Sequence, residues 1–300
     1  MNPERQRYPE DHWIRSQDPE QALDAYLDQQ SKAYSRAKNE HIRDLLGDLQ
    51  GKRFLDYGCG AGYFSVHAAL SGAAQVVGVD AEETVLSTAR YFARQENVDR
   101  LCHFLPSDRF PSFPAHVRFD VILMKDVIEH VEDDQGLLED AASVIEPGGT
   151  IVISTQNAMS INYLLEGTYQ RAIRRNQRWF GWDDTHLRFY TPPALASKLR
   201  RAGFKPVRWR SAYLIPYKLP RLPGSGKKFT RIDALSWIDK TLGRFFPYNH
   251  LGWSIIVKAV ARPEVPAKIR VMTPANREFA PEAAWAPPAV ILPRTLDPAS

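Results

Sequence analysis

The residues best suited to chemistry follow an apolar run near the middle of the chain. Residues Val121–Met124 are typical of a buried strand, and Asp126, Glu129 and His130 come directly after them. A buried strand does not ordinarily run out into two carboxylates and an imidazole. In open α/β sheets, ligands bind beyond the carboxyl ends of the strands. We therefore predict that the stretch Phe119–Val131 forms one wall of an active site.

Two kinds of catalysis are open to this wall. In the simpler one, His130 acts as a general base that removes a proton from a nucleophile. In the other, Asp126, Glu129 and His130 lie on one face of a helical turn, because they are three and four residues apart. Carboxylate oxygens with an imidazole suit Mg²⁺, Mn²⁺, Fe²⁺ or Zn²⁺, and such a metal lowers the pKa of a bound hydroxyl. A purely structural hydrogen bond to Glu129 is the alternative to both.

A glycine-rich loop offers a second kind of site. After a strand predicted at residues 53–57, the loop carries glycines at alternate positions: Gly58, Gly60 and Gly62. Glycines let the backbone turn tightly and approach a ligand, and the helix that follows offers amide donors at its N-terminus. The next predicted strand ends at Asp80, where a carboxylate can accept ribose hydroxyls. Asp56, just before the glycines, favours a cationic ligand because it would repel phosphate.

Four motifs together resemble the class I S-adenosylmethionine-dependent methyltransferases. They are the loop DYGCGAG at residues 56–62, the strand end VVGVD at 76–80, the aspartate at 108, and EPGGTIVIS at 146–154. The resemblance covers roughly residues 50–212 and, with a late strand, extends to 262. It implies S-adenosylmethionine as the cofactor and a methyl transfer as the reaction.

The resemblance also implies which residues contact the cofactor. The predicted contacts are Asp56, Gly58 and Gly60 in the loop, Asp80 on the ribose, Ser107 and Asp108 near the adenine, and Lys125 beside the methionine part. For Ser107 and Asp108 an equally good interpretation is that they only open a turn.

The wall after the fourth strand resembles two groups of metal-dependent O-methyltransferases more narrowly: the ubiquinone-pathway enzymes and the small-RNA 2′-O-methyltransferases. Both carry an acidic-x-x-Glu-His stretch here, and the RNA enzymes add a downstream histidine, which His186 in DDTHLRFYTP matches. The resemblance implies Asp126, Glu129, His130 and His186 as metal ligands, and Glu129, His130 and His186 as catalytic residues. Asp126 departs from the glutamate of both groups, so this shorter side chain either drops out or binds through water.

The elements that must position these residues alternate along the chain. Strands are predicted at 53–57, 75–79, 101–105, 117–124, 150–154, 204–209 and 253–261, and helices at 63–71, 81–95, 134–144, 192–202 and 231–245. Such alternation predicts an α/β fold: a Rossmann-like, doubly wound, seven-stranded sheet. Helical insertions are expected after strands five and six, at about 156–185 and 213–250.

The ends of the chain differ from this central part. Residues 1–50 are predicted to form an N-terminal arm and a lid helix, with helical spacing from Pro19 to Leu49. Residues 51–262 are the expected methyltransferase domain. Residues 263–300 are rich in proline and are expected to be extended or disordered.

The insertions combine basic and aromatic residues. In the first, Arg171, Arg174, Arg175 and Arg178 recur at helical spacing and precede Trp179, Phe180 and Trp182. This pattern predicts one basic helical face that recognises an anionic or aromatic acceptor, or a membrane surface. A solvated arginine face over packed aromatics is the alternative. The second insertion repeats the combination, with a helix predicted over Arg231–Phe245.

Composition narrows the classes of function. The chain has 39 lysines and arginines against 35 acidic residues, a net charge of +4, which does not favour nucleic acid as a partner. Its two cysteines, the absence of an apolar N-terminal segment and the lack of any membrane-length apolar run predict a cytoplasmic protein.

The sequence therefore predicts a methyltransferase that acts on an oxygen of a small or medium acceptor, such as a sugar, a phenol or a natural-product intermediate. The alternatives are an N-methyltransferase with a histidine base and an RNA 2′-O-methyltransferase. Besides the small-molecule acceptor, peripheral contact with a membrane is the other partner that the sequence suggests. It does not indicate an oligomeric state.

Overall fold

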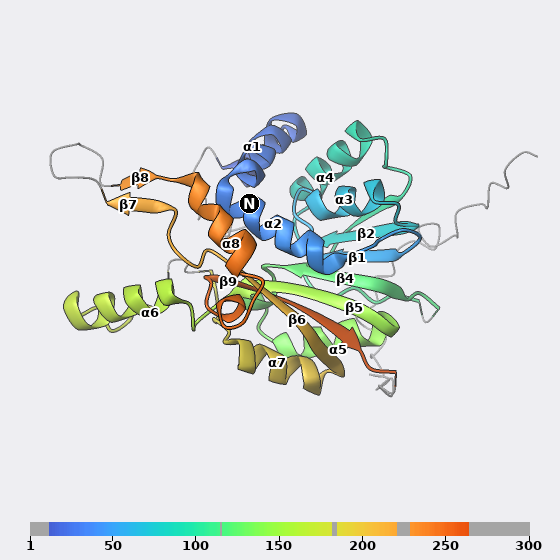
Figure 1. The fold of residues 1–300 in the computed structure, drawn as a ribbon. Coiled ribbons are helices and arrows are strands. Elements are labelled where there is room, and N and C mark those ends of the chain that lie inside the picture. Colours follow the sequence, from blue (N-terminus) through green and yellow to red (C-terminus); the bar gives the residue numbers. More distant parts are fainter. Residues whose placement is uncertain (1–11, 115, 182–184, 221–228, 264–300) are drawn as a thin grey trace, which may run out of the picture.

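The fold is built on one twisted sheet of seven strands (Figure 1). The computed structural model describes residues 12–114, 116–181, 185–220 and 229–263. The strand order is β3-β2-β1-β4-β5-β9-β6. The strands are β1 (Arg53–Tyr57), β2 (Gln75–Asp80), β3 (Cys102–Pro106), β4 (Phe119–Lys125), β5 (Ile145–Gln156), β6 (Phe204–Ala212) and β9 (Ser254–Ala261). The predicted seven-stranded α/β fold is confirmed.

Neighbouring strands run parallel from β3 through to β5, and β9 is antiparallel to both β5 and β6. The polypeptide's last described strand therefore lies between two earlier ones. A separate antiparallel pair, β7 (Lys218–Pro220) and β8 (Phe229–Arg231), falls in the second insertion. The start of β5 differs most from its predicted position. The strand pairs with β4 from Ile145 onward, which is before the turn that was expected to precede it.

Helices cover both faces of the sheet because consecutive strand residues point to opposite faces. Phe54 packs with residues of α2 (Ala33–Leu46), α3 (Tyr63–Leu70) and α4 (Glu83–Gln95). Its neighbour Leu55 packs with residues of α5 (Asp134–Val144) and α7 (Pro192–Arg201). Figure 1 shows α2, α3 and α4 above the sheet and α5 and α7 below it. Both layers hold the carboxyl ends of β1, β2 and β4 at one edge of the sheet.

The N-terminal helical stretch is divided in two. After a short 3-10 turn, η2 (Trp13–Arg15), α1 runs from Pro19 to Ser31 and α2 begins at Ala33. Asp18 caps α1 by accepting a hydrogen bond from the amide of Glu20 at 3.0 Å, as the Asp-Pro start predicts. Lys32 adopts an extended conformation between the two helices. The segment that was predicted as one lid helix therefore forms two helices.

The two insertions are less regular than predicted. The first holds α6 (Ile161–Thr168) and a π-helical turn, η4 (Tyr169–Ile173), and the second holds α8 (Ser236–Leu242) between the 3-10 turns η5 (Asp233–Leu235) and η6 (Tyr248–His250). The helix ends at Ile173 and Arg175 has a left-handed backbone, so the prediction of four arginines on one helical face is wrong. Trp182, the basic residues Arg221, Lys227 and Lys228 of the second insertion, and the proline-rich segment 264–300 lie outside the described residues. Among the helices that are described, none combines the length and the apolar character that crossing a bilayer requires.

Candidate active site

The glycine loop and the wall after β4 lie side by side because β1 and β4 are neighbours, with Tyr57 paired to Met124. The amides of Gly58 and Cys59 donate to the carbonyl of Val79 at 2.8 and 2.9 Å, which fixes the turn. Gly58 has a φ of +74°, and a Cβ at this position would lie 2.3 Å from Cγ2 of Val127. Only glycine fits there, so the loop and the wall are in direct contact.

Two carboxylates support the loop: Asp56 is buried and Asp80 is half-buried. Asp80 accepts hydrogen bonds from the amides of Gly60 at 2.9 Å and Glu82 at 3.3 Å, and burial raises its pKa. Asp56 is 2% exposed and accepts a hydrogen bond from Oγ of Ser65 at 2.8 Å. Burial raises the pKa of Asp56 to about 7, against the opposing effect of that hydrogen bond. The residues predicted in this part of the cofactor site therefore gather at the carboxyl ends of β1 and β2.

The other predicted cofactor residues lie around this centre. The amide of Ser107 donates to the carbonyl of Asp80 at 2.9 Å, which places the start of the loop after β3 beside Asp80. The Ser107 hydroxyl donates to the carbonyl of Arg109 at 2.8 Å, and Asp108 is exposed. This geometry is that of a local turn, and the adenine contact stays a prediction. Lys125 ends β4, where burial lowers its pKa.

An N-terminal cap, made of η2, α1 and α2, covers the glycine loop. Cη2 of Trp13 lies 4.0 Å from the point that a Cβ on Gly60 would occupy. The Trp13 indole donates to Oε1 of Gln29 at 3.0 Å, and its ring lies 4.8 Å from that of Tyr26, which is buried on α1. The lid was predicted, but no sequence pattern pointed to Trp13 as the residue that reaches the loop.

Three of the four predicted metal ligands converge. Glu129, His130 and His186 each offer a ligand atom, and these atoms lie within 4.8 Å of one another. The short 3-10 helix η3 (Ile128–His130) carries the first two. The loop with His186 is held against it: the amide of Leu187 donates to the carbonyl of Glu129 at 2.9 Å, and Nδ1 of His130 lies 3.2 Å from the carbonyl of Thr185.

The donor set fits a divalent cation. Glu129 is fully buried, and its Oε2 accepts a hydrogen bond from Thr155 at 2.9 Å. Its Oε1 is buried with no hydrogen-bond partner among the residues that the structure describes. Burial and the nearby charge of Asp126 raise the pKa of Glu129. A cation beside Oε1 would satisfy this oxygen and favour the charged carboxylate.

Asp126, the fourth predicted ligand, is engaged elsewhere. Both of its carboxylate oxygens accept hydrogen bonds from the ammonium group of Lys38, and Oδ1 also accepts one from Ser154 at 3.0 Å. Burial would raise the pKa of Asp126, but Lys38 and Lys125 outweigh it and lower that pKa. Asp126 also has a left-handed backbone, with a φ of +56°. The inclusion of Asp126 in the ligand set is therefore corrected: it pairs with α2 of the cap.

Aromatic rings connect His186 to the first insertion. The His186 ring lies 5.5 Å from that of Phe189, which in turn lies 5.1 Å from the rings of Tyr163 and Phe180. Tyr163 belongs to α6, and its hydroxyl donates to the carbonyl of Phe180 at 3.0 Å. The insertion thus places aromatic rings beside His186.

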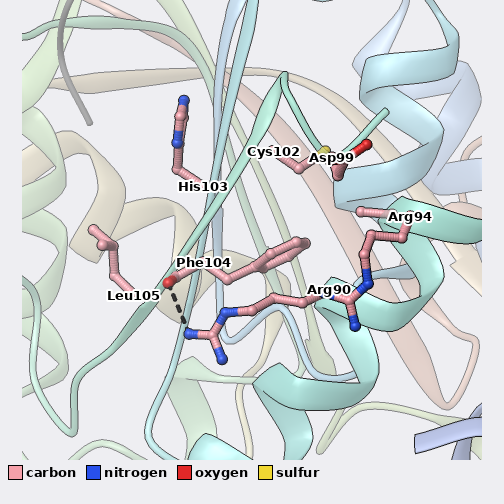
Figure 2. Close-up of a pocket in the computed structure, with 8 residues that line it drawn as sticks. Arg90, Arg94, Asp99, Cys102, His103, Phe104 and Leu105 are labelled. Atoms are coloured by element: carbon pink, nitrogen blue, oxygen red, sulfur yellow. Dashed lines mark hydrogen bonds between the residues drawn. The ribbon is translucent and has the colours of Figure 1, made fainter. Parts of the chain in front are cut away.

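A surface cavity of about 370 Å³ lies away from this centre, between α4 and β3 (Figure 2). Arg90, Arg94, His103 and Phe104 contribute to its lining, and Arg90 donates to the carbonyl of Phe104 at 3.1 Å. None of the predicted site residues lines this cavity. We therefore locate the candidate active site at the glycine loop and the wall after β4, and not at the cavity.

Comparison with known proteins identifies the class. The family model described as a methyltransferase domain matches residues 27–208. A ubiquinone biosynthesis O-methyltransferase of Bordetella avium is 31% identical over 169 residues, which cover 56% of this chain and 68% of that protein. The corresponding protein of Acinetobacter baumannii is 31% identical over 163 residues, covering 54% of this chain and 67% of its own length.

Solved structures show the same fold. An S-adenosylmethionine-dependent methyltransferase from Mesorhizobium loti superposes with a TM-score of 0.51 at 21% identity, over 75% of this chain and 97% of that one. Magnesium protoporphyrin IX methyltransferase from Synechocystis, with bound S-adenosylhomocysteine, gives 0.50 at 17% identity, over 76% and 85%.

The chain therefore belongs to the methyltransferase-domain family. More narrowly, it is an S-adenosylmethionine-dependent methyltransferase of class I. The loop fits this cofactor, because glycine at position 58 leaves the backbone bare beside Val127 and Asp80 presents a carboxylate at the end of β2.

Proposed function

We propose that this methyltransferase acts on an oxygen atom of a small or medium acceptor, such as a sugar, a phenol or a natural-product intermediate, with a divalent cation held by Glu129, His130 and His186. The observation that carries the proposal is the convergence of these three side chains within 4.8 Å. The names of the O-methyltransferase relatives support oxygen as the methylated atom.

Each residue has a definite task in this proposal. S-adenosylmethionine supplies a methyl group activated by its sulfonium, so the protein must position the acceptor and manage its proton. A divalent cation supplies a lowered pKa for an acceptor hydroxyl. Glu129 provides a buried carboxylate that Thr155 orients, and His186 approaches from across the pocket. The aromatic rings beside His186 form an apolar wall for the acceptor.

His130 is the most accessible of the three ligands and is oriented by the backbone. A proton on Nδ1, donated to the carbonyl of Thr185, leaves the lone pair of Nε2 free. Metal-binding histidines commonly donate their other ring nitrogen to a carbonyl in this way. The same arrangement suits a general base, so metal-free deprotonation by His130 is the second candidate mechanism, for an oxygen or a nitrogen acceptor.

Calorimetric titration of the metal-stripped protein with Mn²⁺, Mg²⁺ and Zn²⁺ tests the metal. We expect one site per chain, and we expect His186→Ala to weaken it by about 10–100-fold or more. His103→Ala, which changes a histidine on β3 outside the cluster, is the matched control and should bind metal like the parent. Full methyl transfer after exhaustive chelation, with no metal site in the titration, would assign proton removal to His130 alone.

A further inference from the structure

Helix α6 presents its apolar residues to solvent. Ile161, Leu164, Leu165, Tyr169 and Ile173 recur three and four residues apart along α6 and η4, and all are exposed. Leu165 and Ile173 have exposed fractions of 68% and 70%. In an ordinary surface helix this spacing marks the face that packs on the core. Here it marks the outer face, and Figure 1 shows α6 extending away from the sheet.

The inner face of α6 already has its packing partners. Tyr163 and Gly167 are the buried residues of the helix. A Cβ on Gly167 would lie 2.9 Å from the Trp179 ring, so glycine is what allows this ring to pack closely. The guanidinium of Arg171 lies 5.6 Å from the same ring, as a cation–π contact. The exposed stripe is therefore an additional apolar surface, not a displaced part of the core.

A second group of exposed rings precedes a residue that is hydrogen-bonded to the start of α6. Phe245, Phe246 and Tyr248 are exposed and lie just before Leu251. The carbonyl of Leu251 accepts a hydrogen bond from the amide of Ile161, the first residue of α6, at 3.3 Å. Exposed apolar residues gathered in this way commonly mark an interaction site in a soluble protein.

The charge of the segment points to the chemistry of the partner. Residues 159–181 contain four arginines and a single acidic residue, Glu166, which accepts a hydrogen bond from Gln170 at 2.7 Å. Arg174 and Arg178 are exposed beyond the end of the helix. An apolar stripe bordered by arginines is the pattern of helices that lie in a membrane interface, where arginines pair with anionic headgroups.

We propose that residues 159–181 dock this methyltransferase on an anionic lipid bilayer, with the outer face of α6 and η4 in the headgroup region. Docking on a second copy is disfavoured by charge. A two-fold interface would bring the same arginines of both copies together, with one glutamate each to offset them. A lipid surface rich in phosphate groups has the complementary charge.

Docking in this orientation has a consequence for the acceptor. Tyr163 on the inner face of α6 contacts Phe189, whose ring contacts His186, so the docked helix lies beside the proposed acceptor site. If the proposed function holds, apolar acceptors that partition into the bilayer are within reach of this pocket.

Sedimentation of the full chain with vesicles tests the docking independently of any activity. We expect binding to phosphatidylcholine vesicles that contain phosphatidylglycerol, little binding to phosphatidylcholine alone, and a loss of binding as salt rises. Leu165→Glu with Ile173→Glu should abolish binding. Arg174→Ala, Arg175→Ala and Arg178→Ala together should weaken it by about 100-fold. Leu70→Glu, at a residue of α3 that is 57% exposed, is the matched control and should bind like the parent.

Several outcomes would overturn the proposal. They are no binding to anionic vesicles at low salt, equal binding to neutral and anionic vesicles, and unchanged binding by the Leu165→Glu, Ile173→Glu variant. A dimer in sedimentation velocity that this variant dissociates, without vesicle binding by the parent, would assign the surface to a second copy. S-adenosylmethionine binding by every variant shows that the fold is kept, so failure of docking is distinguishable from failure of the proposed function.

Discussion

The cofactor side and the acceptor side of this active site are built in different ways. On the cofactor side, the glycine loop, Asp56 and Asp80 come from one stretch of 25 residues, and backbone amides make most of the contacts. On the acceptor side, Glu129 and His130 meet His186 and Thr155 from distant parts of the chain, and Asp126 meets Lys38 from 88 residues away. The proposed cofactor site is thus built from local sequence, and the proposed acceptor site from tertiary contacts.

The two sides also stabilise their carboxylates differently. Asp56 and Asp80 are stabilised by a hydroxyl and by amides, and burial raises the pKa of each. Asp126 is stabilised by the nearly buried ammonium of Lys38. The acceptor side therefore depends on an ion pair that joins the N-terminal cap to the wall.

The largest effect is expected from the acceptor-side histidines. His130→Ala and His186→Ala should each lower kcat by about 10²–10⁴-fold, because each removes a group that holds or deprotonates the acceptor. Affinity for S-adenosylmethionine should change little, since neither residue touches the glycine loop. Steady-state kinetics and calorimetry measure the two quantities, and a parallel loss of cofactor affinity would contradict the division into two sides.

The ion pair between cap and wall should dominate the stability of this region. Lys38→Met leaves the charge of Asp126 without its partner and is expected to lower the free energy of unfolding by about 3 kcal/mol. Denaturant unfolding measures the change. Lys32→Met removes the exposed pair with Asp28, at 3.4 Å, and should cost about 0.5 kcal/mol or less. Equal costs for the two variants would show that Lys38 has no special role.

A substitution in the glycine loop should affect mainly the cofactor. Gly58→Ala adds a methyl 2.3 Å from Val127 at a left-handed backbone position, and should weaken S-adenosylmethionine binding by about 10–100-fold. Gly51→Ala is the matched control: its φ is +69°, with nothing within 4 Å of the added Cβ. Val127→Ala should partly restore binding to Gly58→Ala, because Val127 makes the clash. No rescue would mean that backbone strain alone explains the loss.

A smaller, pH-dependent effect is expected at His41 on α2. Burial lowers its pKa from 6.5 to about 4, and its Nε2 lies 2.9 Å from the carbonyl of Asp239. The unfolded chain therefore binds the proton more readily, so stability is complete above pH 7 and is lost as the pH falls from 6.5 toward 4.

Between pH 6.5 and 5 the contribution of His41 should fall by about 1.5 kcal/mol. Unfolding of His41→Gln at several pH values should show a flatter profile over this range. His67→Gln, on α3 of the cofactor side, should change the profile less, because His67 is only half-buried. A His41→Gln profile parallel to that of the parent would contradict the assignment.

The difference between the two sides also explains what the sequence could predict. The loop DYGCGAG and the strand end at Asp80 carry their geometry in local residue types, so their placement was predicted correctly. The pairing of Lys38 with Asp126 and the left-handed backbone of Asp126 depend on how α2 packs over the sheet, and no local pattern indicates either. The spacing of Asp126, Glu129 and His130 suggested one helical face, but the turn begins only at Ile128 and excludes Asp126.

The first insertion shows the same limit. The arginine spacing predicted that the helix continues past Arg174, but the helix ends at Ile173. The apolar spacing of Ile161, Leu164 and Leu165 is visible in the sequence, but it does not reveal which face is outward. That depends on Trp179, which packs against Gly167 from the other side of the helix.

The position of β9 has a consequence for how the protein is assembled during synthesis. β9 pairs with β5 on one side and with β6 on the other, and among the described strands of the sheet it is the last to be translated. The four strands β1–β4 are complete once residue 125 has left the ribosome, whereas the edge of β5 stays unpaired until residue 261 has done so. The cofactor side can therefore form on a nascent chain well before the acceptor side, which leaves Ile151 and Ile153 to be sheltered from aggregation in the meantime.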